Sequence, residues 1–134
     1  VNKKVAKSMK PGSHGSTFGG NPLAMSVGNA VLDVILKKGF LKKVEDNGKF
    51  FKSKLEDLKA EYPKIIKEVR GKGLLLGIKV NVNMVNFIKK LTKKRLLTVK
   101  ASENVIRLLP PLNVKKSEIN QAVLIIKSVC EDFK

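Results

Sequence analysis

Apolar residues recur at helical spacing in two stretches of the first half of the chain. Between residues 23 and 35 they form one side of a helix that Asn21 caps and Pro22 opens, because proline at the first helical position loses no hydrogen bond. Between residues 41 and 62 they repeat at intervals of three and four, and Gly48 takes the one vacant place. Glycine weakens a helix, so Gly48 indicates close contact with another element. We therefore predict two consecutive helices.

The pattern changes in the second half to short, nearly continuous apolar runs. Residues 69–80 are too apolar for a surface strand and predict one buried strand, and residues 96–99 and 105–109 predict two more. Residues 84–91 and 119–133 have the periodicity of amphipathic helices. This order predicts an α/β fold in which two linking helices precede a small sheet covered by helices.

Composition narrows the class of protein. The chain has 134 residues, of which 43% are hydrophobic, enough for a folded domain without disulfide bonds. No apolar run approaches the roughly 18 residues of a membrane span, and the start is too polar for a signal peptide. The chain does not begin with methionine, which suggests a fragment. The single cysteine, Cys130, lies in an apolar stripe, which favours a packing role and a reducing compartment such as the cytoplasm.

The net charge of +17 raises the possibility of nucleic acid or an anionic membrane as a partner. Only three of the 28 basic residues are arginines, the residue type that reads bases and phosphates in a bidentate manner. The lysines are spread along the chain, which favours a solvated surface. A lysine-rich α/β nucleic-acid-binding module remains the alternative, although the predicted strands carry no aromatic residue for base stacking.

The densest chemical signal is the glycine-rich segment 11–22. Hydroxyl groups and free amides before a helix suit an anion such as phosphate, and an ordinary glycine-rich connection explains the same residues equally well. The segment lacks the Gly-Lys-Ser/Thr of a P-loop. His14 has no cysteine, second histidine or carboxylate near it in sequence, so we interpret it as a loop residue and predict no metal site.

Three motifs in this order resemble the class III (ornithine-type) aminotransferases. They span His14–Ala24, Val69–Ile78 and Asn104–Leu112, and the likeness is greatest to the acetylornithine type. These are fold-type I enzymes that depend on pyridoxal phosphate, so the resemblance implies the C-terminal part of that fold. Residues 1–62 would form the end of the large cofactor-binding domain with its linking helices, and residues 63–134 the small α/β domain.

The resemblance also implies roles for three residues. Thr17 matches the threonine that holds the cofactor phosphate across a homodimer interface, and Ser16 beside it would assist. Arg107 matches the arginine that pairs with the carboxylate of glutamate or 2-oxoglutarate, which suits its planar guanidinium. From the residues alone, an edge-strand arginine facing water is the favoured interpretation of Arg107, and only the resemblance favours the carboxylate role.

Family members form a Schiff base with a lysine that lies upstream of the Gly-Ser-Thr motif, outside this chain. The resemblance therefore implies a C-terminal fragment that is inactive alone, with no catalytic residue of its own. The parent enzyme would transfer an amino group from acetylornithine to 2-oxoglutarate in arginine biosynthesis, in the cytoplasm, without nucleic acid or membrane as partner. Lys94-Arg95 stands where relatives often carry glycine.

Overall fold

The computed structural model describes residues 2–134, which divide into two compact units between Phe40 and Leu41. The first unit holds a short helix, α1 (Lys3–Ala6), and a longer one, α2 (Pro22–Ile35). The predicted cap of α2 is confirmed, because the Oδ1 atom of Asn21 accepts the N–H of Ala24 at 2.9 Å.

Helix α2 is rich in apolar residues and has one charged residue, Asp33. None of its residues is buried, and its large apolar side chains are exposed, namely Leu23, Met25, Val27, Val31, Leu32 and Val34. A helix that exposes this many large apolar side chains is ordinarily covered by other protein. This unit is therefore built to be covered by other protein.

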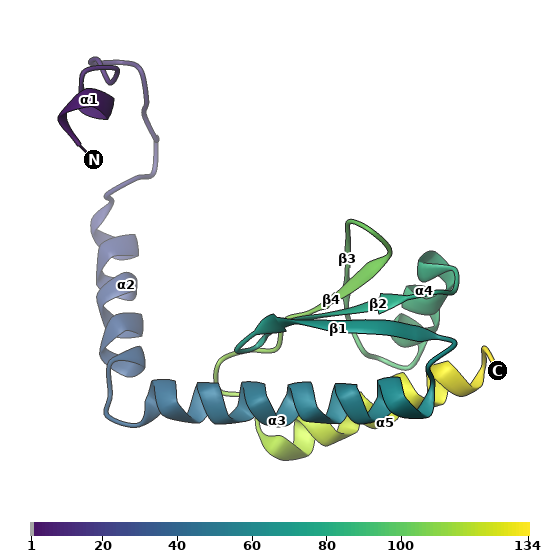
Figure 1. The fold of residues 1–134 in the computed structure, drawn as a ribbon. Helices are drawn as coiled ribbons and strands as arrows, with labels where there is room; N and C mark the ends of the chain where they lie inside the picture. Colours follow the sequence, from purple (N-terminus) through teal and green to yellow (C-terminus); the bar gives the residue numbers. More distant parts are fainter. Residues whose placement is uncertain (1) are drawn as a thin grey trace. The chain divides into compact units, whose positions relative to one another are not determined.

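The second unit is a four-stranded antiparallel sheet with helices packed on one face (Figure 1). The strand order is β1-β2-β4-β3, and α3 and α5 run along the same side of the sheet. The elements are α3 (Phe40–Glu61), β1 (Ile66–Lys72), β2 (Leu75–Val80), α4 (Met84–Lys93), β3 (Val99–Ala101), β4 (Val105–Leu108) and α5 (Lys116–Glu131). The predicted α/β class is thus confirmed. The predicted boundary after residue 62 separates the end of a large cofactor-binding domain from the small domain. It stays a prediction.

The hydrophobic core lies between the sheet and these helices. On β2, Leu76 and Ile78 alternate with outward residues and are buried together with Leu55 of α3 and Ile126 of α5. The opposite face of the sheet, called the open face here, is covered by no helix of residues 41–134. It consists of the outward residues of the four strands, chiefly Arg70, Lys72, Leu75, Gly77, Lys79, Val99, Ala101, Val105 and Arg107.

The single strand predicted over residues 69–80 is wrong. The segment is a hairpin of β1 and β2, whose register pairs Gly71 with Leu76 and Lys72 with Leu75. Both strands are rich in apolar residues because their inner sides share one core, so the run looks continuous in sequence. The turn signal was Gly71 and Gly73, which both have positive φ angles.

Gly48 explains how closely α3 approaches this hairpin. A Cβ atom at Gly48 would lie 2.6 Å from the carbonyl carbon of Gly73, so only glycine fits there. The neighbouring Asn47 is buried, and its Nδ2 donates to the carbonyl oxygen of Val114 at 2.8 Å. The predicted close contact at Gly48 is confirmed, and its partner is the β1–β2 turn.

Arg95 adopts the left-handed conformation that ends α4, with a φ of 64°. The N–H of Leu96 closes this turn by donating to the carbonyl oxygen of Leu91 at 3.0 Å. Because a side chain is strained there, we expect Arg95→Gly to raise the free energy of unfolding by about 0.5–1 kcal/mol. Urea unfolding measures the change, with Arg95→Lys as the control. An Arg95→Gly variant that is less stable than the unaltered chain would contradict the strain that we assign to Arg95.

Candidate functional site

An exposed loop over residues 8–20 joins α1 to α2 in the first unit. Its backbone bends at Gly12 and Gly20, whose φ angles of 82° and 73° favour glycine. Ser16 closes a local turn, since its Oγ accepts the N–H of Gly19 at 2.9 Å. That bond leaves the hydroxyl hydrogen of Ser16 available as a donor.

Thr17 follows with both of its donors open. Neither its hydroxyl nor its main-chain N–H is hydrogen-bonded to another group of residues 2–134. The first carboxylate along the chain is Asp33, and four lysines lie before the loop or in its first residues: Lys3, Lys4, Lys7 and Lys10. Neutral donors in a carboxylate-free, basic segment suit a phosphate dianion. The residues present therefore fit the phosphate of the expected cofactor.

The start of α2 contributes little to such a site. Pro22 has no N–H, and the N–H of Ala24 already donates to Asn21. The donors available to an anion therefore come mainly from the loop at Ser16 and Thr17 rather than from the helix end.

Arg107 lies in the second unit, in the middle of the sheet. It sits on β4 between Gly77 of β2 and Val99 of β3, so the edge-strand interpretation is wrong. Its side chain is exposed on the open face, and no carboxylate of residues 2–134 is paired with it. The guanidinium can therefore bind a carboxylate from outside. Ser16 and Thr17 share one loop, whereas Arg107 belongs to the other unit.

The open face carries further charges that the sequence analysis did not single out. Glu103, in the β3–β4 turn, places its Oε2 3.3 Å from Nη1 of Arg70 and 3.8 Å from Nζ of Lys79. A hollow of about 570 Å³ lies on this face, and Arg70, Gly77 and Arg107 are among the residues that line it. The only feature of the sequence that pointed to Glu103 was the polar run Ser-Glu-Asn before β4, which is typical of a turn.

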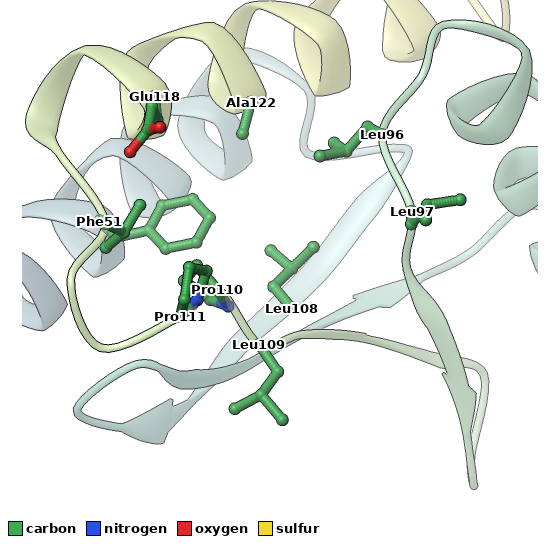
Figure 2. Close-up of a pocket in the computed structure, with 10 residues that line it drawn as sticks. Phe51, Leu96, Leu97, Leu108, Leu109, Pro110, Pro111, Glu118 and Ala122 are labelled. Atoms are coloured by element: carbon green, nitrogen blue, oxygen red, sulfur yellow. The ribbon is translucent and has the colours of Figure 1, made fainter. Parts of the chain in front are cut away.

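A second cavity, of about 350 Å³, lies next to the end of β4 (Figure 2). Phe51, Leu96 and Leu108 point toward one another across it, and its one acidic residue is Glu118. The Glu118 carboxylate accepts the N–H of Lys115 at 2.7 Å and so caps α5. This cavity is apolar packing space and offers no chemistry for a reaction.

The remaining candidates are structural. Burial raises the pKa of the Cys130 thiol to about 12, so this side chain packs and does not react. His14 is exposed in the loop, and the described part of the chain contains no cluster of residues that could hold a metal ion. Among the helices of residues 2–134, none is long and apolar enough to cross a membrane.

Comparison with known proteins adds a family to this geometry. The family model described as "Aminotransferase class-III" matches residues 1–130. The chain is 50% identical over 119 residues to the acetylornithine aminotransferase of Agrobacterium fabrum, covering 89% of this chain and 30% of the relative. It is 44% identical over 128 residues to that of Brucella melitensis, covering 96% of this chain and 32% of the relative. The chain therefore spans about a third of the length of these relatives.

Solved structures share the fold. The acetylornithine aminotransferase of Elizabethkingia anophelis superposes with a TM-score of 0.82 and 37% identity, covering 99% of this chain and 36% of that chain. The ornithine delta-aminotransferase of Plasmodium falciparum superposes with a TM-score of 0.84 and 32% identity, covering 99% of this chain and 34% of that chain. Both matches extend over both units of the chain.

Proposed function

This chain belongs to the class III aminotransferases, and we propose that it supplies the C-terminal part of an acetylornithine aminotransferase that uses pyridoxal phosphate. The observation that carries the proposal is the identity of 44–50% to relatives with that name. The proposed reaction moves the terminal amino group of acetylornithine to 2-oxoglutarate, giving glutamate and an aldehyde. We place it in arginine biosynthesis in the cytoplasm.

Within that enzyme we assign residues 1–62 to the end of the large domain with its linking helices and residues 63–134 to the small domain. The exposed apolar surface of α2 supports this assignment, because a large domain and a second subunit would bury it. We propose a homodimer in which the loop of one subunit serves the site of the other.

Ser16 and Thr17 are proposed to hold the cofactor phosphate. The Thr17 hydroxyl and main-chain N–H, with the Ser16 hydroxyl hydrogen, supply donors that residues 2–134 do not otherwise use. Pyridoxal phosphate, when bound, supplies an aldehyde that takes up the amino group and a ring that delocalises negative charge. The loop anchors the phosphate and so orients the ring.

Arg107 is proposed to bind the carboxylate of glutamate and 2-oxoglutarate. Its rigid strand fixes the direction of the side chain, and two parallel N–H donors of the guanidinium match the two carboxylate oxygens. Holding the acid in this way orients the carbon that gains or loses the amino group.

The alternative, a lysine-rich nucleic-acid-binding module, is not supported. None of the four strands carries an aromatic residue, and the family match extends over nearly the whole chain. Spread lysines on a solvated surface account for the net charge of +17.

Two experiments test the proposed function. Reading the coding sequence before the Val1 codon should reveal a lysine at a strand end, upstream of the Gly-Ser-Thr motif. The complete encoded protein, purified with pyridoxal phosphate, should form glutamate from acetylornithine and 2-oxoglutarate. If the protein uses ornithine or 4-aminobutyrate but not acetylornithine, the proposed amine donor is wrong. If it catalyses no transamination at all, the proposal is refuted.

In the complete enzyme, Thr17→Ala should weaken cofactor binding by about tenfold to a hundredfold, because a hydrogen bond to a charged phosphate is worth about 1.5–3 kcal/mol. Equilibrium dialysis of the cofactor measures the loss, and thermal unfolding of the cofactor-free protein checks the fold. Thr17→Ser keeps the hydroxyl and should bind the cofactor almost normally. Equal affinity in all three proteins would rule out the role of Thr17.

A further inference from the structure

Two arginines share one row of the open face. The strand register places Arg70 of β1 and Arg107 of β4 on either side of Gly77 of β2, and all three line the same hollow. A face with two free guanidiniums would bind both ends of a dicarboxylate. Only one of the two is free, because Arg70 is paired with Glu103.

The side chain of Arg70 runs past Gly77 and reaches Glu103. A Cβ atom at Gly77 would lie 2.8 Å from Cγ1 of Val105 and 3.8 Å from Cγ of Arg70. Position 77 is therefore crowded by Val105, whereas the stem of Arg70 lies at an ordinary contact distance and its Nη1 ends 3.3 Å from the Glu103 carboxylate.

Glu103 is an unfavourable residue for the turn that it occupies. Both central residues of the β3–β4 turn have positive φ angles, 59° at Glu103 and 62° at Asn104. Such a turn favours glycine, asparagine and aspartate. Asn104 fits, and its Nδ2 also donates to the carbonyl oxygen of Val82 at 3.1 Å. The backbone does not explain a glutamate at position 103, whereas its contacts with Arg70 and Lys79 do.

We infer that Glu103 is a positioning residue that draws Arg70 and Lys79 together and leaves Arg107 as the one free guanidinium on the open face. This inference rests on the proposed function, in which Arg107 binds a substrate carboxylate. Its consequence is selectivity: the open face binds one carboxylate group, and the second group of a dicarboxylate gains little there. Lys72, which also lines the hollow, is present in all variants below.

The arginine side chains allow a direct test on the 134-residue chain. The sequence has three arginines, so the Nε–Hε signals of Arg70, Arg95 and Arg107 can be assigned by single replacement with lysine, and Arg95 serves as an internal reference. Titration with butyrate and with glutarate gives two dissociation constants, and the ratio of the butyrate constant to the glutarate constant measures the preference for the dicarboxylate. In the unaltered chain only the Arg107 signal should shift, and this ratio should be small.

Glu103→Gln should release Arg70, so that glutarate gains about fivefold over butyrate, a moderate value because the site is exposed to solvent. The Arg70 signal should then respond to glutarate as well. Glu103→Asn should show the same gain for glutarate. Its free energy of unfolding should be no lower than that of the unaltered chain, because asparagine suits the turn. Glu56→Gln, which removes a paired carboxylate of α3, is the charge-matched control and should leave the ratio unchanged.

The outcomes separate this inference from the proposed function. An Arg107 response that is lost in Arg107→Gln, together with an unchanged ratio in Glu103→Gln, would overturn the role of Glu103 alone. A ratio that changes equally in Glu56→Gln would also overturn it, since net charge would then be the cause. If Arg107 in the unaltered chain does not respond to either acid, the carboxylate role itself fails and the inference fails with it.

Discussion

Arg107→Lys in the complete enzyme is expected to slow the half-reaction with 2-oxoglutarate and glutamate by about a hundredfold, and the half-reaction with acetylornithine far less. Lysine keeps the positive charge but loses the two-pronged geometry, so the acid is held loosely and the reacting carbon is misplaced. A misplacement of this kind lowers kcat as well as raising KM. Following the cofactor absorbance in each half-reaction separately measures the two effects.

Arg95→Lys is the matched control, because it makes the same chemical change at the end of α4, outside the proposed site. It should leave both half-reactions unaltered. An equal loss in both half-reactions of Arg107→Lys would point to a structural role in the small sheet. No loss in either would make Arg107 an ordinary exposed residue of β4.

Gly71→Ala is expected to lower the free energy of unfolding by about 4 kcal/mol, from backbone strain and overpacking together. The φ angle of Gly71 is 123°, and a Cβ atom there would lie 2.1 Å from the carbonyl oxygen of Leu75. The β1 strand would have to separate from β2 at the point where α3 also packs. Urea unfolding followed by circular dichroism measures the loss, and the yield of folded protein serves if the variant unfolds in water.

Gly73→Ala is the control for this prediction. Gly73 lies in the same turn with a φ of 57°, but a Cβ atom there would meet nothing within 4 Å. Its replacement should cost only the backbone strain, about 1 kcal/mol. Equal effects of the two replacements would show that the contact between Gly71 and β2 is not what makes glycine necessary.

Local signals in the sequence were sufficient where neighbouring residues decide the structure. Asn21 and Pro22 predicted the start of α2, because a cap acts within one helical turn. The spacing of apolar residues over 41–62 predicted α3, which spans Phe40–Glu61. The motifs predicted the family, which the family match confirms. The roles of Ser16, Thr17 and Arg107 stay predictions, since they depend on contacts with ligands.

The sequence was insufficient where one apolar run contains two strands. Residues 69–80 were predicted as one strand because both β1 and β2 turn apolar residues toward the same core, and periodicity does not reveal the turn between them. The strand predicted over 96–99 is β3 at Val99–Ala101, later in the chain. Its position depends on pairing with β4, and pairing partners are set by contacts between residues far apart in sequence.

By itself, the sequence determined the class of the fold, the approximate positions of the four longer helices and the cap of α2 at Asn21. These properties follow from side chains and their close neighbours along the chain. Only the tertiary structure decided that Arg107 lies on an inner strand with its guanidinium unpaired, and that Glu103 takes Arg70 away from it. Strand order and register bring these residues together across more than thirty positions of sequence, as the separation of 33 between Arg70 and Glu103 shows. No local pattern encodes such a contact, because it exists only once the sheet has formed.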